Sequence, residues 1–221
     1  MPWHRWSGLI LQTIKWPLAL GAAWFLPAVL WALGQELRLG LDALDVVFLG
    51  ALLYLLVWFF LLRHSSVTLL STLEHELTHS LFALLTGNRV TGLKVTFTQG
   101  GHMQYLGTGN WLVDVSPYFF PLAAVLLMAA LPFIPELQGT PGQALLGLTL
   151  GYHLCSNWAQ THLGQTDLQK AGLLFCTLFL PTANVCSLGL ALASARAGWP
   201  GMVNWAETAI SAPWHWELLW R

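Results

Sequence analysis

The residues with the clearest chemical potential lie in one short stretch, His75–His79, which reads His-Glu-Leu-Thr-His. Residues four apart on an α-helix lie about 40° apart around its axis, so His75 and His79 share a face. Two imidazoles placed in this way can bind one zinc ion, and Glu76 can act as general base on a water that the zinc activates. The stretch therefore predicts a hydrolytic zinc site.

The setting of this stretch strengthens that interpretation. His75 and His79, together with Glu74 and Glu76, lie inside an apolar run from about Val67 to Leu85. The alternative is a pair of core histidines that bond to their neighbours. Ionisable groups inside a membrane cost a few kcal/mol each and are usually functional, which favours the metal site. Glu76 is the expected base, whereas Glu74 is expected to serve as a second-shell or structural partner.

Composition places the whole chain in a membrane. Of its 221 residues, 56% are hydrophobic and only 9% are charged, whereas an ordinary globular domain is about 25% charged. The 9 Lys and Arg balance 10 Asp and Glu without a basic run, so nucleic acid is not an expected partner. The three Cys lack Cys-x-x-Cys spacing, which argues against a thiolate metal site. We expect a single integral membrane domain over residues 1–221, in contact with the lipid bilayer of the cell membrane.

The hydrophobic pattern predicts an all-α, multi-pass membrane protein with about six transmembrane helices. The expected spans cover residues 15–33, 46–62, 67–87, 117–131, 143–161 and 166–197. Ser65-Ser66 is expected to cap the third helix, and Pro181 to kink the sixth. Residues 199–221 contain five Trp and predict an amphipathic helix on the membrane surface.

One segment breaks the helical pattern. Residues 90–98 alternate and are rich in β-branched side chains, and Gln99-Gly100-Gly101 has the composition of a turn. Residues 102–106 can return antiparallel to the first strand. We therefore expect a small membrane-associated β-hairpin after the helix that carries His75–His79. Its backbone amides cannot remain unpaired in lipid, so it must be interfacial or packed within the protein.

A catalytic zinc site needs a third protein ligand and an open position for water. The candidates outside the motif are His102, Asp114, His153, His162 and Asp167. Asp167 is favoured because it opens an apolar helix, although Asp is also well suited to the first turn of any helix. His153 is the second choice, and it can instead be a second-shell or substrate-polarising group.

Taken together, these features resemble the site-2 protease family, the M50 intramembrane zinc metalloproteases, in a minimal M50B-like form. The resemblance covers about residues 66–180. It includes His75–His79 within a span, the Gly-rich hairpin around residues 99–102, a helix start at residues 116–121, and Asp167 at the family's third-ligand position. The family often has Asn-x-x-Pro before that Asp and Gly after it. Here Asn157 lies ten residues upstream without such a Pro, and Leu168 follows.

The resemblance implies peptide-bond hydrolysis in or near transmembrane segments of membrane protein substrates. It implies His75, His79 and Asp167 as zinc ligands and Glu76 as the catalytic base. It leaves His153, Asn157 and the hairpin residues Gly100, Gly101 and His102 as possible second-shell or substrate-binding positions. A hairpin edge can pair with a locally unwound substrate. The sequence determines neither the oligomeric state nor the substrate's identity.

Three alternatives belong to other classes. A metal transporter can also carry His-Glu-Leu-x-His in a span, but residues 46–62 lack a partner metal-binding motif. A di-iron oxidase needs His-His pairs, which the chain does not contain. A non-catalytic M50 relative that binds metal without protease activity has all the same residue types and stays open.

Overall fold

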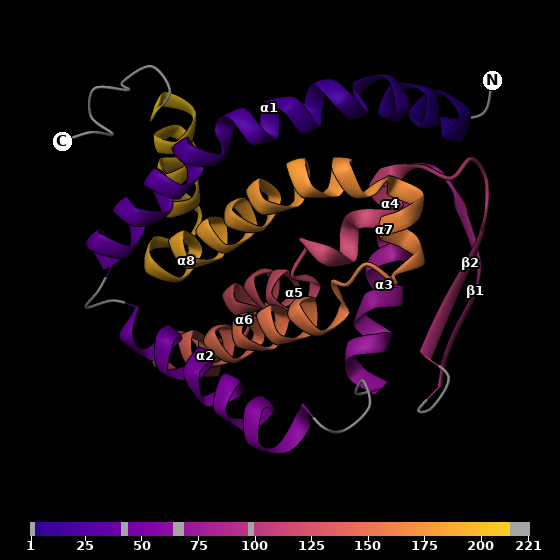
Figure 1. Cartoon of the computed structure of the whole chain (residues 1–221). Coiled ribbons are helices and arrows are strands. Elements are labelled where there is room, and N and C mark those ends of the chain that lie inside the picture. Colours follow the sequence, from indigo (N-terminus) through magenta and orange to yellow (C-terminus); the bar gives the residue numbers. More distant parts are fainter. Residues whose placement is uncertain (1–2, 41–43, 64–68, 97–99, 213–221) are drawn as a thin grey trace.

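The computed structural model describes residues 3–40, 44–63, 69–96 and 100–212, and these are mostly helical (Figure 1). In chain order the elements are α1 (Trp3–Gly40), α2 (Asp45–Val57), η1 (Trp58–Leu62), α3 (Leu69–Leu85), β1 (Arg89–Thr96), β2 (Gly100–Leu106), α4 (Trp111–Val115), η2 (Ser116–Tyr118), α5 (Leu122–Ala130), η3 (Leu131–Phe133), η4 (Pro135–Leu137), α6 (Thr140–Gln160), α7 (Thr166–Ala171) and α8 (Leu173–Ser211). The expected cap at Ser65-Ser66, the turn residue Gln99 and the end of the tail, residues 213–221, lie outside the described residues.

Three helices are long and apolar enough to cross a membrane. They are residues 5–39 of α1, residues 45–62 of α2 with η1, and α8. A fourth span is possible if residues 111–118 and 122–133, which meet at 77°, count together. The expectation of about six spans is therefore not confirmed, because α3 and α6 do not pass this test. Helix α3 carries the His75–His79 motif, and α6 carries the polar residues His153, Asn157 and Gln160.

The outer surfaces of the long helices suit contact with lipid. Large apolar side chains are well exposed there, including Trp24 on α1, Leu49 on α2, and Phe60 and Leu61 on η1. A water-soluble monomer rarely exposes such a dense apolar surface. The protein is therefore a membrane protein, in agreement with its composition.

Helices α2 and α6 approach each other closely along a row of glycines. A Cβ on Gly147 would lie 2.1 Å from the carbonyl oxygen of Val47, and one on Gly151 would lie 2.7 Å from that of Ala51. From the other side, a Cβ on Gly50 would lie 2.4 Å from the Ala144 carbonyl oxygen. Small residues spaced four apart allow such backbone contact between membrane helices.

Helices α1 and α8 run side by side (Figure 1) and share a buried ion pair. The guanidinium of Arg196 donates from Nε to Glu36 Oε1 at 2.5 Å and from Nη2 to Glu36 Oε2 at 3.1 Å. Only 2% of Glu36 is exposed. The pair links the end of α1 to α8 one residue before the bend in α8.

Pro181 lies inside the helical part of α8, and the kink expected there stays a prediction. The bend itself lies at the non-helical residues Ala197 and Gly198, the latter with φ +59°. Glycine reaches this conformation without steric cost, whereas the proline ring is compatible with helical φ. Beyond the bend, Trp205 packs over Gly189, so the helix folds back along α8. The predicted helix in the tail is present to Ser211, and its place at a membrane surface stays a prediction.

The predicted hairpin is present and packs against α3. Strands β1 and β2 are antiparallel, with Lys94 opposite His102 and Val95 opposite Gly101, and a bulge lies between Val90 and Gly92. Along β2 the odd-numbered residues are half-buried and the even-numbered ones are exposed. One face of the hairpin therefore covers α3, at the edge of the molecule (Figure 1).

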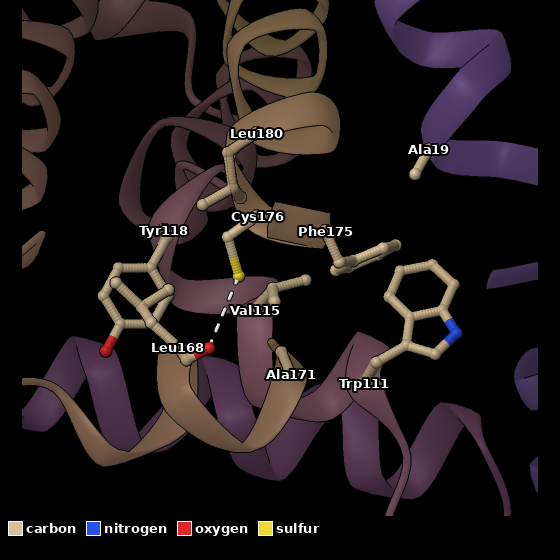
Figure 2. Packing of buried hydrophobic residues seen from close by; sticks show 9 residues of the cluster. All are labelled: Ala19, Trp111, Val115, Tyr118, Leu168, Ala171, Phe175, Cys176 and Leu180. Atoms are coloured by element: carbon tan, nitrogen blue, oxygen red, sulfur yellow. Dashed lines mark hydrogen bonds between the residues drawn. The ribbon is translucent and has the colours of Figure 1, made fainter. Parts of the chain in front are cut away.

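A buried cluster lies where α4, η2, α7 and α8 meet (Figure 2). It includes Trp111, Val115, Tyr118, Leu168 and Phe175, none of which is more than 4% exposed. Trp111 also donates from Nε1 to the backbone oxygen of Leu11, which fixes α4 to α1. Gly172, with φ +92°, lets the chain turn from α7 into α8. This cluster holds α7 in place over α3.

Candidate metal centre

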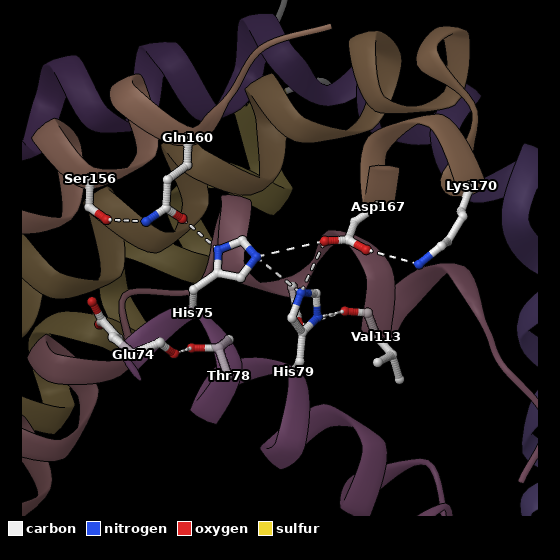
Figure 3. Close-up of polar contacts among 10 residues, drawn as sticks. Glu74, His75, Thr78, His79, Val113, Ser156, Gln160, Asp167 and Lys170 are labelled. Carbon is white, nitrogen blue, oxygen red and sulfur yellow. Dashed lines mark hydrogen bonds and ion pairs between the residues drawn. The ribbon is translucent and has the colours of Figure 1, made fainter. Parts of the chain in front are cut away.

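Three side chains from two distant parts of the chain converge at one point (Figure 3). His75 and His79 come from α3, and Asp167 comes from the first turn of α7. The two Nε2 atoms are 3.1 Å apart. Asp167 Oδ2 lies 3.8 Å from Nε2 of His75 and 3.4 Å from Nε2 of His79. Of the described residues, these three form the group of potential metal ligands whose donor atoms all lie within 4.8 Å of one another.

These spacings fit a tetrahedral zinc site. Zinc bonds imidazole nitrogen and carboxylate oxygen at about 2.0–2.2 Å, so two ligands of a tetrahedral ion lie about 3.3 Å apart. The three measured separations bracket this value. Two histidines and one carboxylate also leave the fourth position for water, as catalytic sites do.

On the side of each imidazole away from Asp167, a hydrogen bond at Nδ1 sets the tautomer of the ring. His75 Nδ1 lies 2.5 Å from Gln160 Oε1, and His79 Nδ1 lies 2.7 Å from the Val113 carbonyl oxygen. Both oxygens only accept, so each Nδ1 carries the proton and each Nε2 presents a lone pair. The amide of Gln160 is itself oriented, because its Nε2 donates to Ser156 Oγ at 3.2 Å. Such outer partners are usual for histidines that bind a metal.

The two oxygens of the Asp167 carboxylate have different partners. Oδ2 faces the histidines, while Oδ1 accepts from Lys170 Nζ at 3.2 Å. Burial alone would raise the pKa of Asp167, but the neighbouring imidazoles of His75 and His79 and the charge on Lys170 hold it well below its usual range. The group is therefore a carboxylate at neutral pH, the form that binds metals.

A polar network fixes the backbone around His79. Asn110 caps α4 by accepting from the Val113 backbone N–H at 3.1 Å, and its Nδ2 donates to Thr86 Oγ1. Ser7 on α1 donates to the backbone oxygen of Thr86 at the end of α3. The Val113 carbonyl that holds His79 is thus tied to both α1 and α3.

Glu76 lies beneath the hairpin. It is 8% exposed, and Gly101 of β2 passes so close that a Cβ there would lie 2.6 Å from Glu76 Cγ and 3.0 Å from Oε1. The second acid has a different environment, because Glu74 Oε1 accepts from the backbone N–H of Ala123 in the first turn of α5 at 2.9 Å. Glu74 therefore has the structural role expected for it, and Glu76 faces the strand.

The comparison with family models matches residues 46–195, well over half of the 221-residue chain, to the peptidase M50B-like family. The chain belongs to this family. Its members are M50 peptidases, the site-2 protease group, and the His-His-Asp cluster lies within the matched segment. No curated protein and no solved structure matches the chain.

In this M50B-like chain, the other candidate ligands lie outside the cluster of His75, His79 and Asp167. His102 is on the exposed face of β2, and His162 is exposed in the turn after α6. Asp114 lies in the first turn of α4, outside the group of three. His153 does not reach the cluster either. With Glu74, His75 and Ser156 it lines a small polar cavity of about 10 Å³.

The residues expected to support the site or to bind substrate also differ in what they touch. Asn157 donates from Nδ2 to the backbone oxygen of Tyr118 at 2.7 Å, so it supports η2. Gly101 contacts Glu76, whereas a Cβ on Gly100 would meet nothing within 4 Å. Gly100 instead has φ +76°, at the end of the hairpin.

Sequence reasoning missed three groups that touch the site. Gln160 and the Val113 carbonyl hold the imidazoles, and Tyr118 packs its ring edge-on against His75 with centroids 5.3 Å apart. A backbone carbonyl has no sequence signature. Gln160 had one weak signal, since it lies with His153 and Asn157 on the polar side of its helix.

Proposed function

We propose that the protein is a multi-pass intramembrane zinc metalloprotease that hydrolyses peptide bonds in or near transmembrane segments of membrane proteins in the cell membrane. The observation that carries the proposal is the convergence of the two Nε2 atoms and Asp167 Oδ2, with both Nδ1 atoms held by acceptors. His75, His79 and Asp167 would hold the ion. When bound, Zn²⁺ supplies Lewis acidity that acidifies water and polarises a carbonyl.

The residues of the chain have distinct tasks in this reaction. Glu76 takes a proton from the attacking water and later returns it to the leaving amine. The fixed tautomers of His75 and His79 keep their lone pairs on the metal side. Lys170 orients the carboxylate of Asp167 from its opposite oxygen.

The hairpin supports a site for an extended substrate. β2 pairs with β1 alone within the described residues, and Gly101 brings the strand directly over Glu76. A peptide that adds to the hairpin as a further strand would run past the base in an extended conformation. A helical substrate must unwind first, so we expect helix-breaking residues near the cleaved bond.

The test uses purified protein in lipid vesicles with a panel of single-span peptides that contain Gly or Pro within the span. Zinc content and fragment masses are measured together. The wild type should bind one zinc and cleave at least one peptide, and Glu76→Gln should keep the zinc but lose cleavage. Glu74→Gln is the matched control, because it removes the same charge two residues away and keeps the oxygen that Ala123 requires.

Metal analysis of two further variants tests the ligand set. Asp167→Ala should lose zinc, and His153→Ala should retain it. The opposite pattern would contradict the assignment of Asp167. A wild type that is full of zinc but cleaves no peptide would favour the alternative, a metal-binding M50 relative without protease activity.

A further inference from the structure

Tyr118 carries a buried hydroxyl group without a partner. Only 1% of the residue is exposed, and among the described residues Oη has no hydrogen-bond partner. A buried hydroxyl left in this state costs about 1–3 kcal/mol. Such groups are uncommon in folded proteins and point to strain, to an unseen water or to a catalytic role.

The residue lies beside the metal centre and is held firmly. Its ring meets that of His75 edge to face, at 5.3 Å and 88°. Its backbone oxygen accepts from Asn157 Nδ2 at 2.7 Å and from Asn184 Nδ2 at 2.9 Å. Asn157 also donates to Asn184 Oδ1, so α6 and α8 together fix η2. Donors that stabilise a transition state work best when they are fixed in advance in this way.

The hydroxyl lies on the outer side of the buried cluster. Figure 2 shows the Tyr118 hydroxyl at the edge of the cluster, on the side away from Cys176 and Phe175. The ring contact with His75 places Tyr118 beside a proposed metal ligand, and its unpartnered hydroxyl can still donate.

Tyr118 also borders open space. It lines a cavity of about 440 Å³ between α6, α7 and α8, and Leu168, the residue after Asp167, lines the same cavity. The walls are mostly apolar, with Leu173, Leu180 and Pro181 among them, whereas Asn157 and Asn184 are polar. An apolar peptide side chain that occupies this cavity would therefore lie next to Tyr118.

We propose that the Tyr118 hydroxyl donates a hydrogen bond to the carbonyl oxygen of the cleaved peptide bond while negative charge develops on that oxygen. The inference rests on the proposed function and adds a catalytic residue to it. The phenol remains protonated throughout, so no proton is transferred from it. Tyr118 supplies the oxyanion contact, and Glu76 handles the protons.

The variant Tyr118→Phe removes only the hydroxyl oxygen. Tyr152→Phe is the matched control, because Tyr152 is also buried with an unpartnered Oη, but its ring packs edge-on against Tyr54 of α2 and not against a metal ligand. The kcat and KM for a cleaved transmembrane peptide are measured for both variants, together with zinc content. We expect Tyr118→Phe to lower kcat by about 10²-fold, with KM and zinc unchanged, and Tyr152→Phe to behave as wild type.

A second measurement separates this inference from the proposed function. The Kd of a phosphinic peptide, whose tetrahedral oxygens mimic the charged oxygen, is compared with that of a peptide ending in a thiol, which lacks them. Tyr118→Phe should weaken the phosphinic peptide about 10²-fold and leave the thiol unchanged. Equal effects on both ligands, unchanged kcat, or loss of zinc would overturn the role. If the wild type binds the phosphinic peptide through Tyr118 but cleaves no peptide, the proposed protease activity is refuted and the hydrogen bond from Tyr118 is not.

Discussion

At the scale of single residues, the metal centre depends on what lies behind each imidazole. The His75 ring is held by Gln160 of α6, a buried residue of which 9% is exposed. We expect Gln160→Leu to remove the acceptor, free the tautomer of His75 and weaken zinc binding by about 10–100-fold. Competition with a chelator of known affinity measures the change.

Lys170→Met provides the comparison for Gln160→Leu. Lys170 also touches a proposed ligand, but its side chain is 63% exposed, so water can replace the bond to Asp167. Its effect on zinc affinity should be smaller than that of Gln160→Leu. Equal or larger weakening by Lys170→Met would show that the tautomer of His75 is not the controlling factor.

The same residues indicate what a sequence can reveal. His75 and His79 lie four residues apart on one helix, so local spacing alone predicted their shared face. Asp167 was favoured over His153 by its place at a helix start, and the structure brings its carboxylate to the two histidines. Gln160 meets His75 across 85 residues of chain. No local pattern encodes that contact, because it depends on how α6 packs against α3.

At the scale of elements, the distance between β2 and α3 controls access to Glu76. A Cβ on Gly101 would lie 2.6 Å from Glu76 Cγ and 2.7 Å from Thr72 Cγ2, so Gly101→Ala must displace the strand or the base. We expect cleavage to fall by about 10²-fold, because small displacements of catalytic groups have effects of this size. Zinc content should stay at the wild-type level.

Gly92→Ala on β1 is the control for Gly101→Ala. Its Cβ would meet only Gln104, at an ordinary contact distance of 3.5 Å. Cleavage assays and zinc analysis on both variants check the prediction. Full activity in Gly101→Ala would mean that the hairpin does not set the position of Glu76.

Elements were predictable to differing degrees for physical reasons. The hairpin was found because alternation and β-branched residues are local signals. The fourth expected span, residues 117–131, is instead divided between η2 and α5, which starts after Pro121. The break leaves the Tyr118 carbonyl free to accept from Asn157 and Asn184. Those partners lie on α6 and α8, so hydropathy along one segment could not indicate the break.

The contact between α2 and α6 gives a prediction of its own. Gly147→Ala would place a Cβ 2.1 Å from the Val47 carbonyl oxygen, which forces the two helices apart. Overpacking of this kind costs about 1–3 kcal/mol. Gly21→Ala on α1 meets nothing within 4 Å and should be neutral or slightly stabilising. Unfolding in detergent micelles, followed by circular dichroism, measures both, and equal stability would contradict the close helix contact.

At the scale of the whole molecule, an ion pair joins α1 and α8, the two longest helices, which lie together on one side of the fold (Figure 1). Arg196→Met would leave the Glu36 carboxylate buried without its bidentate partner. Removing one partner of a buried ion pair costs about 3–5 kcal/mol of folding stability, because the charge of the other partner is left uncompensated. We therefore expect a large loss of stability against unfolding in detergent.

Replacing both partners separates the cost of a lone buried charge from the value of the pair. When a buried pair is exchanged for apolar groups of similar size, the net effect is often neutral. The double variant Glu36→Leu with Arg196→Met should therefore recover most of the stability that Arg196→Met loses. The metal ligands belong to α3 and α7, so zinc content should remain at wild-type level in every variant that folds. A double variant as unstable as the single one would mean that α1 and α8 need the ion pair itself to stay together.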